Sequence, residues 1–168
     1  MKSKIGFKLR LLLLSVFVGS NVMAAGDPIA SVAALKAKLT SKGTPKIEGT
    51  HKIGDKEAPG LKFGAMNINT NENAVVDSIK DKLGGICTIF VRTGEDFIRI
   101  STNALDKDGK RCMGTLLKNP GPAYSAIKAG NSYTGEADVC GTIYKTYYEP
   151  LKIADKIEGI YFCGYKKE

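Results

Sequence analysis

Apolar and polar residues follow two different spacings along this 168-residue chain. In three segments the apolar residues recur every three or four positions, as the buried side of an amphipathic helix requires. These helices are expected over residues 28–39, 73–82 and 122–129. Elsewhere short apolar or alternating runs lie between turn residues, which is typical of strands. The strands are expected over residues 61–67, 86–92, 97–102, 133–139, 142–148 and 159–165.

Turn and capping residues support this division. Asp27 precedes the first helix and Pro28 occupies its first position, a common helix start. Residues 44–60 are rich in Gly, Lys and Pro, so we expect an extended connection there. Turns at residues 93–96 and at Cys140–Gly141 join neighbouring strands into hairpins. Two leading helices followed by hairpin-connected strands predict an α+β fold with an antiparallel sheet.

Residues 1–24 have the composition of a cleavable export signal. Basic residues precede an apolar run over residues 11–18, and the small residues Val22 and Ala24 follow at the positions that a signal peptidase reads. The run is much shorter than the roughly 20 residues that a membrane-spanning helix needs. We therefore expect a signal peptide, cleavage after Ala24, and a periplasmic or secreted mature chain without a membrane span.

A prepilin leader is the alternative, because Gly6-Phe7 resembles a prepilin cleavage site. Lys8 and Arg10 would interrupt the apolar helix that follows such a site. Leu11 also stands where a pilin carries an acidic residue. These three positions favour the signal peptide.

The charge of the chain changes when the leader is set aside. The whole sequence carries 25 basic and 17 acidic residues, a net charge of +8. Four of the basic residues and no acidic residue lie in the leader, so the remainder carries +4. Its lysines are scattered, and no stripe of aromatic and basic residues accompanies them. We therefore expect no nucleic-acid partner.

The four cysteines follow the leader, at Cys87, Cys112, Cys140 and Cys163. An even number in an exported protein favours disulfides, and three pairings are possible. The spacings contain no C-x-x-C, and His51 is the only histidine. Zinc sites, haem attachment and thioredoxin-type chemistry therefore lack support, and we expect neither a metal nor a cofactor.

Catalytic motifs are missing, and the polar decoration of the strands points to binding. The sequence has no G-x-S-x-G and no Gly-rich phosphate loop with its lysine, so we expect no enzyme. A regular strand would place Arg99, Ser101 and Asn103 on one face and Ile98, Ile100 and Thr102 on the other. Tyr144, Thr146 and Tyr148 would share a face in the same way. Such residues either line a pocket for a small carboxylate or simply reach water from a half-buried sheet.

Several separated motifs in the strand region resemble one known family. They are Gly84-Gly85-Ile86-Cys87-Thr88-Ile89-Phe90, Phe97-Ile98-Arg99-Ile100-Ser101-Thr102-Asn103, Gly114-Thr115, Pro122-Ala123-Tyr124, Tyr133-Thr134-Gly135-Glu136-Ala137 and the run from Tyr144 to Pro150. Together they resemble a single Cache domain of the Cache-3/Cache-2 fusion type, the extracytoplasmic sensor of chemoreceptors and histidine kinases. The resemblance covers roughly residues 60–165.

The resemblance implies a PAS-like Cache fold, with a five-stranded antiparallel sheet behind N-terminal helices. The expected organisation is a signal peptide over residues 1–24, an N-terminal helix and extended connection over 25–60, and a Cache sensor domain over 61–168. A ligand would lie between the sheet and residues 114–129. The ligands of such domains are small metabolites, often organic acids or amino acids. Because the sequence ends with this domain, we expect a solitary exported sensor that contributes to chemotaxis or related signal transduction through a membrane-bound receptor or histidine kinase.

The resemblance also implies a set of functional residues. The expected ligand contacts are Arg99, Thr102, Asn103, Thr115, Tyr124, Tyr133, Tyr144, Thr146 and Tyr148. In a sheet of this kind the first and last strands are neighbours, so Cys87 would pair with Cys163 and Cys112 with Cys140. An interaction module without a pocket, which regulates a membrane receptor or kinase, is the alternative function, and a redox role of the cysteines is a third.

Overall fold

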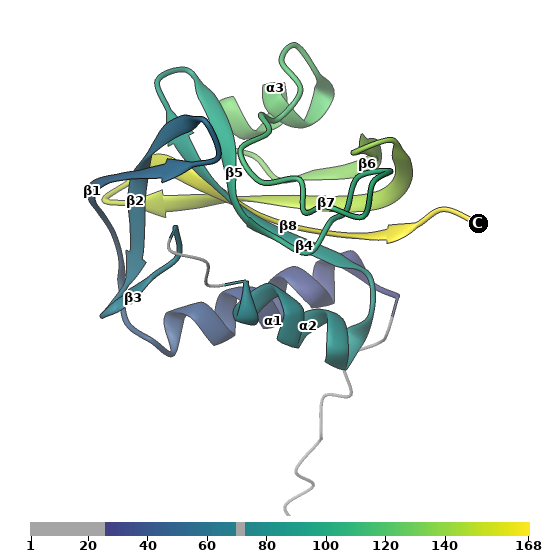
Figure 1. Cartoon of the computed structure of the whole chain (residues 1–168), viewed down its shortest axis with the longest axis horizontal. Coiled ribbons are helices and arrows are strands. Elements are labelled where there is room, and N and C mark those ends of the chain that lie inside the picture. Colours follow the sequence, from purple (N-terminus) through teal and green to yellow (C-terminus); the bar gives the residue numbers. More distant parts are fainter. Residues whose placement is uncertain (1–25, 70–72) are drawn as a thin grey trace, which may run out of the picture.

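The computed structural model describes residues 26–69 and 73–168 (Figure 1). The expected signal peptide lies outside the described residues. The elements are α1 (Pro28–Thr40), β1 (Pro45–Ile53), β2 (Lys56–Phe63), β3 (Met66–Asn67), α2 (Ala74–Leu83), β4 (Ile86–Thr93), β5 (Asp96–Thr102), α3 (Pro122–Lys128), β6 (Tyr133–Val139), β7 (Thr142–Ile153) and β8 (Lys156–Lys166). No helix among the described residues has the length and apolar character needed to cross a bilayer.

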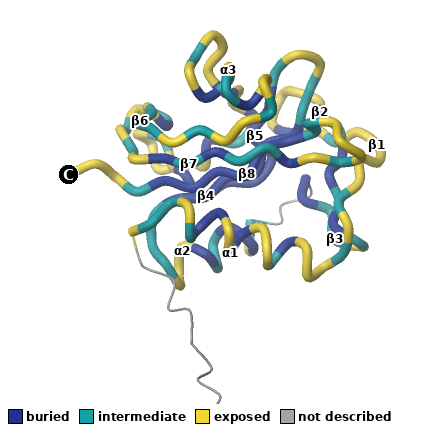
Figure 2. Tube along the Cα trace, turned by 180° about the vertical axis from the view of Figure 1, so that it is seen from behind, coloured by how far each residue is buried: buried dark blue, intermediate teal, exposed yellow. Residues whose placement is uncertain are grey.

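The main sheet has five antiparallel strands in the order β5-β4-β8-β7-β6. Helices α1 and α2 cover one face, and α3 lies over part of the other (Figure 1). The central strand β4 is buried over most of its length, and β8 is buried over residues 159–164 (Figure 2). On the helix side Ile89 packs with Leu35, and on the α3 side Phe90 and Phe162 pack with Ile127. The α+β fold with a five-stranded antiparallel sheet is therefore confirmed.

The start of α1 follows from the residues that precede it. The carboxylate of Asp27 accepts a hydrogen bond from the backbone N–H of Ile29 at 2.9 Å, and Pro28 opens the helix. This satisfies one of the N–H groups that have no partner inside a helix. The buried side of the helix carries Val32, Leu35 and Leu39, as the spacing predicts. These three residues anchor α1 to the sheet.

The segment expected as an extended connection is a β-hairpin. Strands β1 and β2 pair antiparallel, and the short β3 extends them into a separate three-stranded sheet. Strand β2 buries Ala58, Leu61 and Phe63, whereas β1 is exposed along nearly its whole length. Because β1 has only one well-buried residue, its sequence lacks the apolar alternation that marks a strand.

A β-bulge in β5 corrects the predicted assignment of faces. Ser101 pairs with Ile89 and Arg99 pairs with Phe90, so Ile100 is an extra residue without a partner in β4. One extra residue shifts the alternation of the side chains that follow. Arg99 lies on the α3 side of the sheet, over Phe90, whereas the Ser101 hydroxyl hydrogen-bonds Asn73 at the start of α2. The prediction that Arg99 and Ser101 share a face was therefore wrong.

Two disulfides use all four cysteines, in the pairs that the family resemblance implies. Cys87 and Cys163 stand opposite each other in β4 and β8, and both are fully buried. Cys112 lies in the segment after β5, and Cys140 lies at the tip of the β6–β7 hairpin. The first disulfide therefore joins two central strands. The second joins the segment after β5 to the tip of the β6–β7 hairpin.

Candidate functional site

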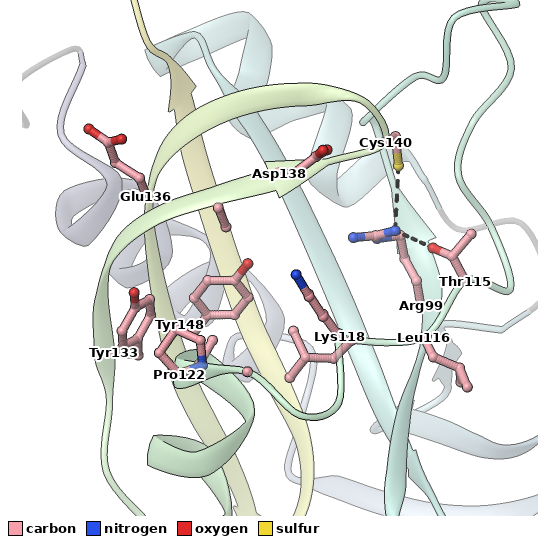
Figure 3. A pocket seen from close by; sticks show the side chains of 14 residues that line it. Arg99, Thr115, Leu116, Lys118, Pro122, Tyr133, Glu136, Asp138, Cys140 and Tyr148 are labelled. Carbon is pink, nitrogen blue, oxygen red and sulfur yellow. Dashed lines mark hydrogen bonds between the residues drawn. The ribbon is translucent and has the colours of Figure 1, made fainter.

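A cavity of about 340 Å³ lies on the α3 side of the sheet (Figure 3). Its walls come from β5, the segment between Thr115 and Ala123, the β6–β7 hairpin and β7. The lining residues are Arg99, Thr115, Leu116, Leu117, Lys118, Gly121, Pro122, Ala123, Tyr133, Glu136, Ala137, Asp138, Cys140 and Tyr148. This volume suits a small metabolite.

Arg99 reaches the cavity from β5 and is only 7% exposed. Its Nη1 donates to the Thr115 hydroxyl and lies 3.6 Å from Cys140 Sγ (Figure 3). Its guanidinium carbon lies 4.9 Å from the centre of the Phe90 ring, a cation–π contact. No carboxylate among the described residues lies within 4.0 Å of it as an ion pair.

The environment of Arg99 is unfavourable for a charge. Its Nε is buried and has no hydrogen-bond partner among the residues that the structure describes. Loss of solvation lowers the pKa of the Arg99 guanidinium to about 10, far below its usual value. At neutral pH the group is still charged, because even this pKa lies well above 7. Within the described part of the chain, Arg99 is therefore a buried cation without a counter-ion, beside an open cavity.

The segment that carries Thr115 is held along the edge of β5. Arg99 N–H donates to the Thr115 carbonyl at 2.9 Å, Gly114 N–H donates to the Arg99 carbonyl at 2.8 Å, and Leu117 N–H donates to the Phe97 carbonyl at 2.9 Å. Gly114 has a φ of +73°, and a Cβ there would lie 3.1 Å from the Ile53 carbonyl oxygen. A glycine is therefore required where this segment passes the tip of the β1–β2 hairpin.

Tyr148 and Tyr133 form the aromatic wall opposite Arg99 (Figure 3). Their ring centres are 6.0 Å apart. Tyr148 is 4% exposed, and burial raises the pKa of its phenol to about 12. At neutral pH this hydroxyl is therefore protonated and can donate a hydrogen bond to a bound molecule.

Three charged residues at the cavity were not predicted from the sequence. Lys118 is exposed, and its amino group points into the space between Arg99 and the aromatic wall (Figure 3). Asp138 accepts the Gly141 N–H at 2.7 Å, and Glu136 pairs with Lys167 at 2.8 Å. Lys118 lies in a segment without helix or strand periodicity, so nothing in the sequence marks it.

Four of the nine expected ligand contacts line the cavity: Arg99, Thr115, Tyr133 and Tyr148. The other five lie elsewhere. Tyr124 donates to the Glu95 carbonyl at 2.8 Å, outside the lining. Thr146 is buried and donates to the Gly135 carbonyl at 2.7 Å, and Tyr144 packs on the same side of the sheet without lining the cavity.

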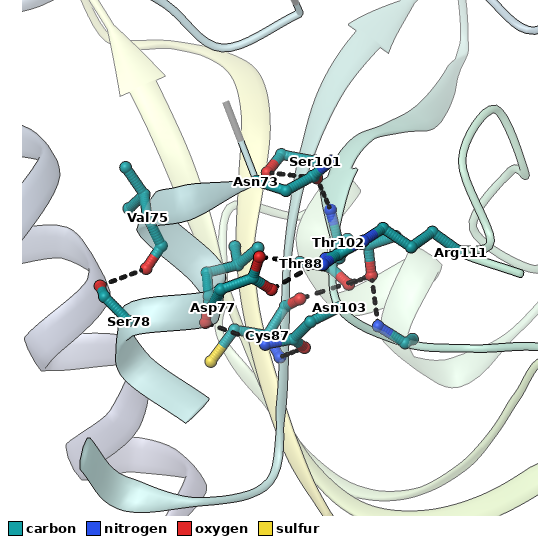
Figure 4. A network of polar contacts seen from close by, with 12 residues as sticks. Asn73, Val75, Asp77, Ser78, Cys87, Thr88, Ser101, Thr102, Asn103 and Arg111 are labelled. Carbon is teal, nitrogen blue, oxygen red and sulfur yellow. Dashed lines mark hydrogen bonds and ion pairs between the residues drawn. The ribbon is translucent and has the colours of Figure 1, made fainter. Parts of the chain in front are cut away.

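Thr102 and Asn103 are buried and belong to a polar network that includes the start of α2 (Figure 4), where the Thr102 N–H donates to the Asn73 side chain at 3.0 Å. The Thr102 hydroxyl lies 2.6 Å from the Thr88 hydroxyl. The Asn103 side chain accepts the Cys87 N–H at 2.7 Å and donates to the Val76 carbonyl at 2.9 Å. Cys87 lies in β4 and Val76 lies in α2, so the side chain of Asn103 joins these two elements.

Asn103→Ala is expected to lower the free energy of unfolding by about 3 kcal/mol, because it leaves buried backbone groups without partners. Tyr124→Phe is the control, since it removes one hydrogen bond from a half-buried side chain and should cost less than about 1 kcal/mol. Urea unfolding of both variants measures the difference. Equal costs would show that the Asn103 bonds contribute no more than an ordinary surface bond.

The described residues contain no group of three or more His, Cys, Asp or Glu that could hold a metal. The cavity has the properties of a binding site: a small volume, a buried cation, hydroxyl donors and an aromatic wall. These properties suit the recognition of a small polar molecule.

The family model of the Cache 3/Cache 2 fusion domain matches residues 27–168. No curated protein matches the chain. Domains of this family sense small molecules outside the cytoplasm and signal through receptors, and its sensor domains are typically non-enzymatic. The match includes α1 and the β1–β2 hairpin as well as the main sheet, so the chain belongs to the Cache 3/Cache 2 fusion domain family.

Proposed function

We propose that this Cache domain is a sensor that binds a small metabolite of organic-acid or amino-acid type, with the ligand carboxylate at Arg99. One observation carries the proposal: a buried guanidinium, which has no carboxylate partner and no hydrogen bond at Nε among residues 26–69 and 73–168, stands beside a cavity of about 340 Å³. Thr115, Tyr133 and Tyr148 are the other proposed contacts.

The energetics of Arg99 support an anionic ligand. A buried charge without a partner costs free energy in the empty protein. A carboxylate can accept two parallel hydrogen bonds from a guanidinium, and its charge compensates that cost. Bonds to charged groups in a water-poor site are stronger than those between neutral groups. Binding would therefore remove an unfavourable feature of the empty site.

The remaining lining residues favour a ligand with a second polar group. Lys118 suits another acidic group, as in a dicarboxylate, and Asp138 suits an amino group, as in an amino acid. The neutral hydroxyl of Tyr148 can donate to either kind of oxygen. Both ligand types therefore belong in the first screen.

The cellular location is part of the same proposal. Residues 1–24 have the pattern of a signal peptide, which would deliver the domain to the periplasm or the medium. Two disulfides fit an oxidising compartment. From there the domain would act through a membrane-bound receptor or histidine kinase, by a preference of the ligand for one conformation and without catalysis.

A thermal-shift screen of the purified protein against organic acids and amino acids tests the function. A ligand at 100 times its dissociation constant should stabilise the domain by about 2.7 kcal/mol, a shift of several degrees. Arg99→Met should abolish the shift, because the side chain keeps much of its apolar length and loses the charge. The same variant should be at least as stable as the wild type without ligand, since replacing a buried unpaired charge by an apolar group is neutral or favourable.

Two outcomes would contradict the proposal. A ligand shift that persists in Arg99→Met would show that the guanidinium does not hold the ligand. The absence of any shift across both ligand classes would favour the pocketless interaction module, whose partner could then be sought by pull-down with the wild-type protein.

A further inference from the structure

The two disulfides lie in different surroundings. Cys87 and Cys163 are fully buried between central strands, where no external thiol can reach them in the folded protein. Cys140 is half-buried at a hairpin tip and lines the cavity, and Figure 3 shows its sulfur pointing toward Arg99. Arg99 Nη1 lies 3.6 Å from that sulfur. One disulfide is therefore enclosed, and the other has a sulfur at an open cavity beside a cation.

We propose that the Cys112–Cys140 disulfide is a site of thiol–disulfide exchange with a dithiol, and that the Cys140 thiolate released by reduction becomes the counter-ion of Arg99. The disulfide joins the segment that carries Thr115 to the β6–β7 hairpin, and both line the cavity. Reduction would therefore remove the covalent link between these two segments. It would also place a negative charge inside the site.

The exchange requires only a dithiol of the kind found in C-x-x-C oxidoreductases. A thiolate of the dithiol attacks Cys140 Sγ, the S–S bond breaks, and the Cys112 sulfur leaves with the electron pair and takes up a proton. The second thiol of the reagent then attacks the mixed disulfide and releases the Cys140 thiolate. The dithiol is oxidised to a disulfide by two electrons, and the cysteine pair is reduced by the same two.

The surroundings of Cys140 favour its thiolate. A thiolate is stabilised next to a lysine or arginine, and the pKa of such thiols falls from about 8.5 to between about 3.5 and 7.5. Arg99 is the group in contact with the sulfur, and it has no other charged partner within 4.0 Å among the described residues. The other titratable groups that line the cavity are Lys118, Tyr133, Glu136, Asp138 and Tyr148.

Two of these groups oppose the effect of Arg99, but more weakly. Glu136 is paired with Lys167, and the Asp138 carboxylate accepts the Gly141 N–H; both residues are exposed. Charges in contact with water are screened, whereas the guanidinium of Arg99 is buried. Lys118 adds a second positive charge at the same cavity.

The consequence for sensing rests on the proposed function. A ligand carboxylate and the Cys140 thiolate would compete for the same guanidinium, so reduction would weaken binding of the ligand. The oxidised protein would then be the form that senses, and the redox state of one disulfide would set its sensitivity.

Selective reduction is the first test. Folded protein is treated with dithiothreitol, free thiols are blocked with iodoacetamide, and the labelled cysteines are identified by mass spectrometry. Cys112 and Cys140 should be labelled at least about tenfold faster than Cys87 and Cys163. Labelling of all four at one rate, or of the buried pair first, would overturn the proposal.

The charge pairing is tested by the pKa of the Cys140 thiol in Cys112→Ala, read from the rate of iodoacetamide alkylation against pH. A value at or below about 7.5 is expected, and Cys112→Ala/Arg99→Gln should return it toward about 8.5. The same titration on wild-type protein with only this disulfide reduced covers the case in which the variant does not fold. A pKa near 8.5 with Arg99 present would overturn the pairing. Neither readout uses a ligand, so a failed ligand screen and a failed exchange reaction are separate results.

Discussion

Replacing Cys87 and Cys163 together by alanine is expected to lower the free energy of unfolding by about 4.5 kcal/mol. The two cysteines are 76 residues apart in the sequence, so their disulfide excludes many extended conformations of the unfolded chain. In the folded protein they stand opposite each other on β4 and β8, which are neighbours in the sheet but far apart in the sequence. Urea unfolding of the oxidised proteins measures the loss.

Cys112→Ala/Cys140→Ala is the matched control for that experiment. Its disulfide spans only 28 residues, so the entropy argument gives it a smaller cost, about 3.5 kcal/mol. The control removes a disulfide outside the main sheet's central strands, whereas the test variant removes the disulfide between β4 and β8. A loss below about 1 kcal/mol in Cys87→Ala/Cys163→Ala would mean that the unfolded chain is already compact without the bond.

Phe90→Ala is expected to cost about 4 kcal/mol, because it leaves a cavity in the centre of the molecule. Phe90 is fully buried on the α3 side of the sheet, in the same cluster as Phe162 and Tyr148. Its ring also lies beneath the Arg99 guanidinium, at 4.9 Å. Phe90→Leu keeps most of the apolar volume and should cost about 1.5 kcal/mol or less.

Phe90→Leu also serves to measure the contact between Phe90 and Arg99. A double-mutant cycle of Phe90→Leu with Arg99→Met should give a coupling of about 1 kcal/mol, in the range of a partly desolvated cation–π contact. Urea unfolding of the four proteins supplies the values. A coupling near zero would mean that the ring holds Arg99 by shape alone.

The elements were predictable where local chemistry determines them. Asp27 and Pro28 start α1, and the Cys140–Gly141 turn joins two strands whose pattern alternates clearly. Strand β1 was missed because almost all of its side chains are exposed, which leaves no apolar alternation in its sequence. It forms a strand because it pairs with β2. Pairing between distant strands has no local signal at all; only the family resemblance suggested that β4 and β8 are neighbours.

The candidate site was predictable in part for the same reason. Arg99 precedes the bulge of β5, and Tyr148 lies on a regular stretch of β7. Alternation places Tyr148 on one face with Tyr144, as the structure has it. Thr102 and Asn103 follow the bulge at Ile100, and their partners come from α2 and β4, which the sequence of β5 alone does not reveal. Lys118 was missed because an irregular segment has no periodicity from which the direction of a side chain can be inferred.

The backbone bonds between β5 and the segment around Thr115 also limit how this protein can move. A strand at the border of a sheet can pair with a strand of another chain, which leads to aggregation. Here Phe97 and Arg99 use their outward backbone groups to bond Gly114, Thr115 and Leu117. If that segment swung away to admit a ligand, it would expose this border to other molecules. The bonds that hold Thr115 at the cavity therefore also protect this border of the sheet from pairing with another chain.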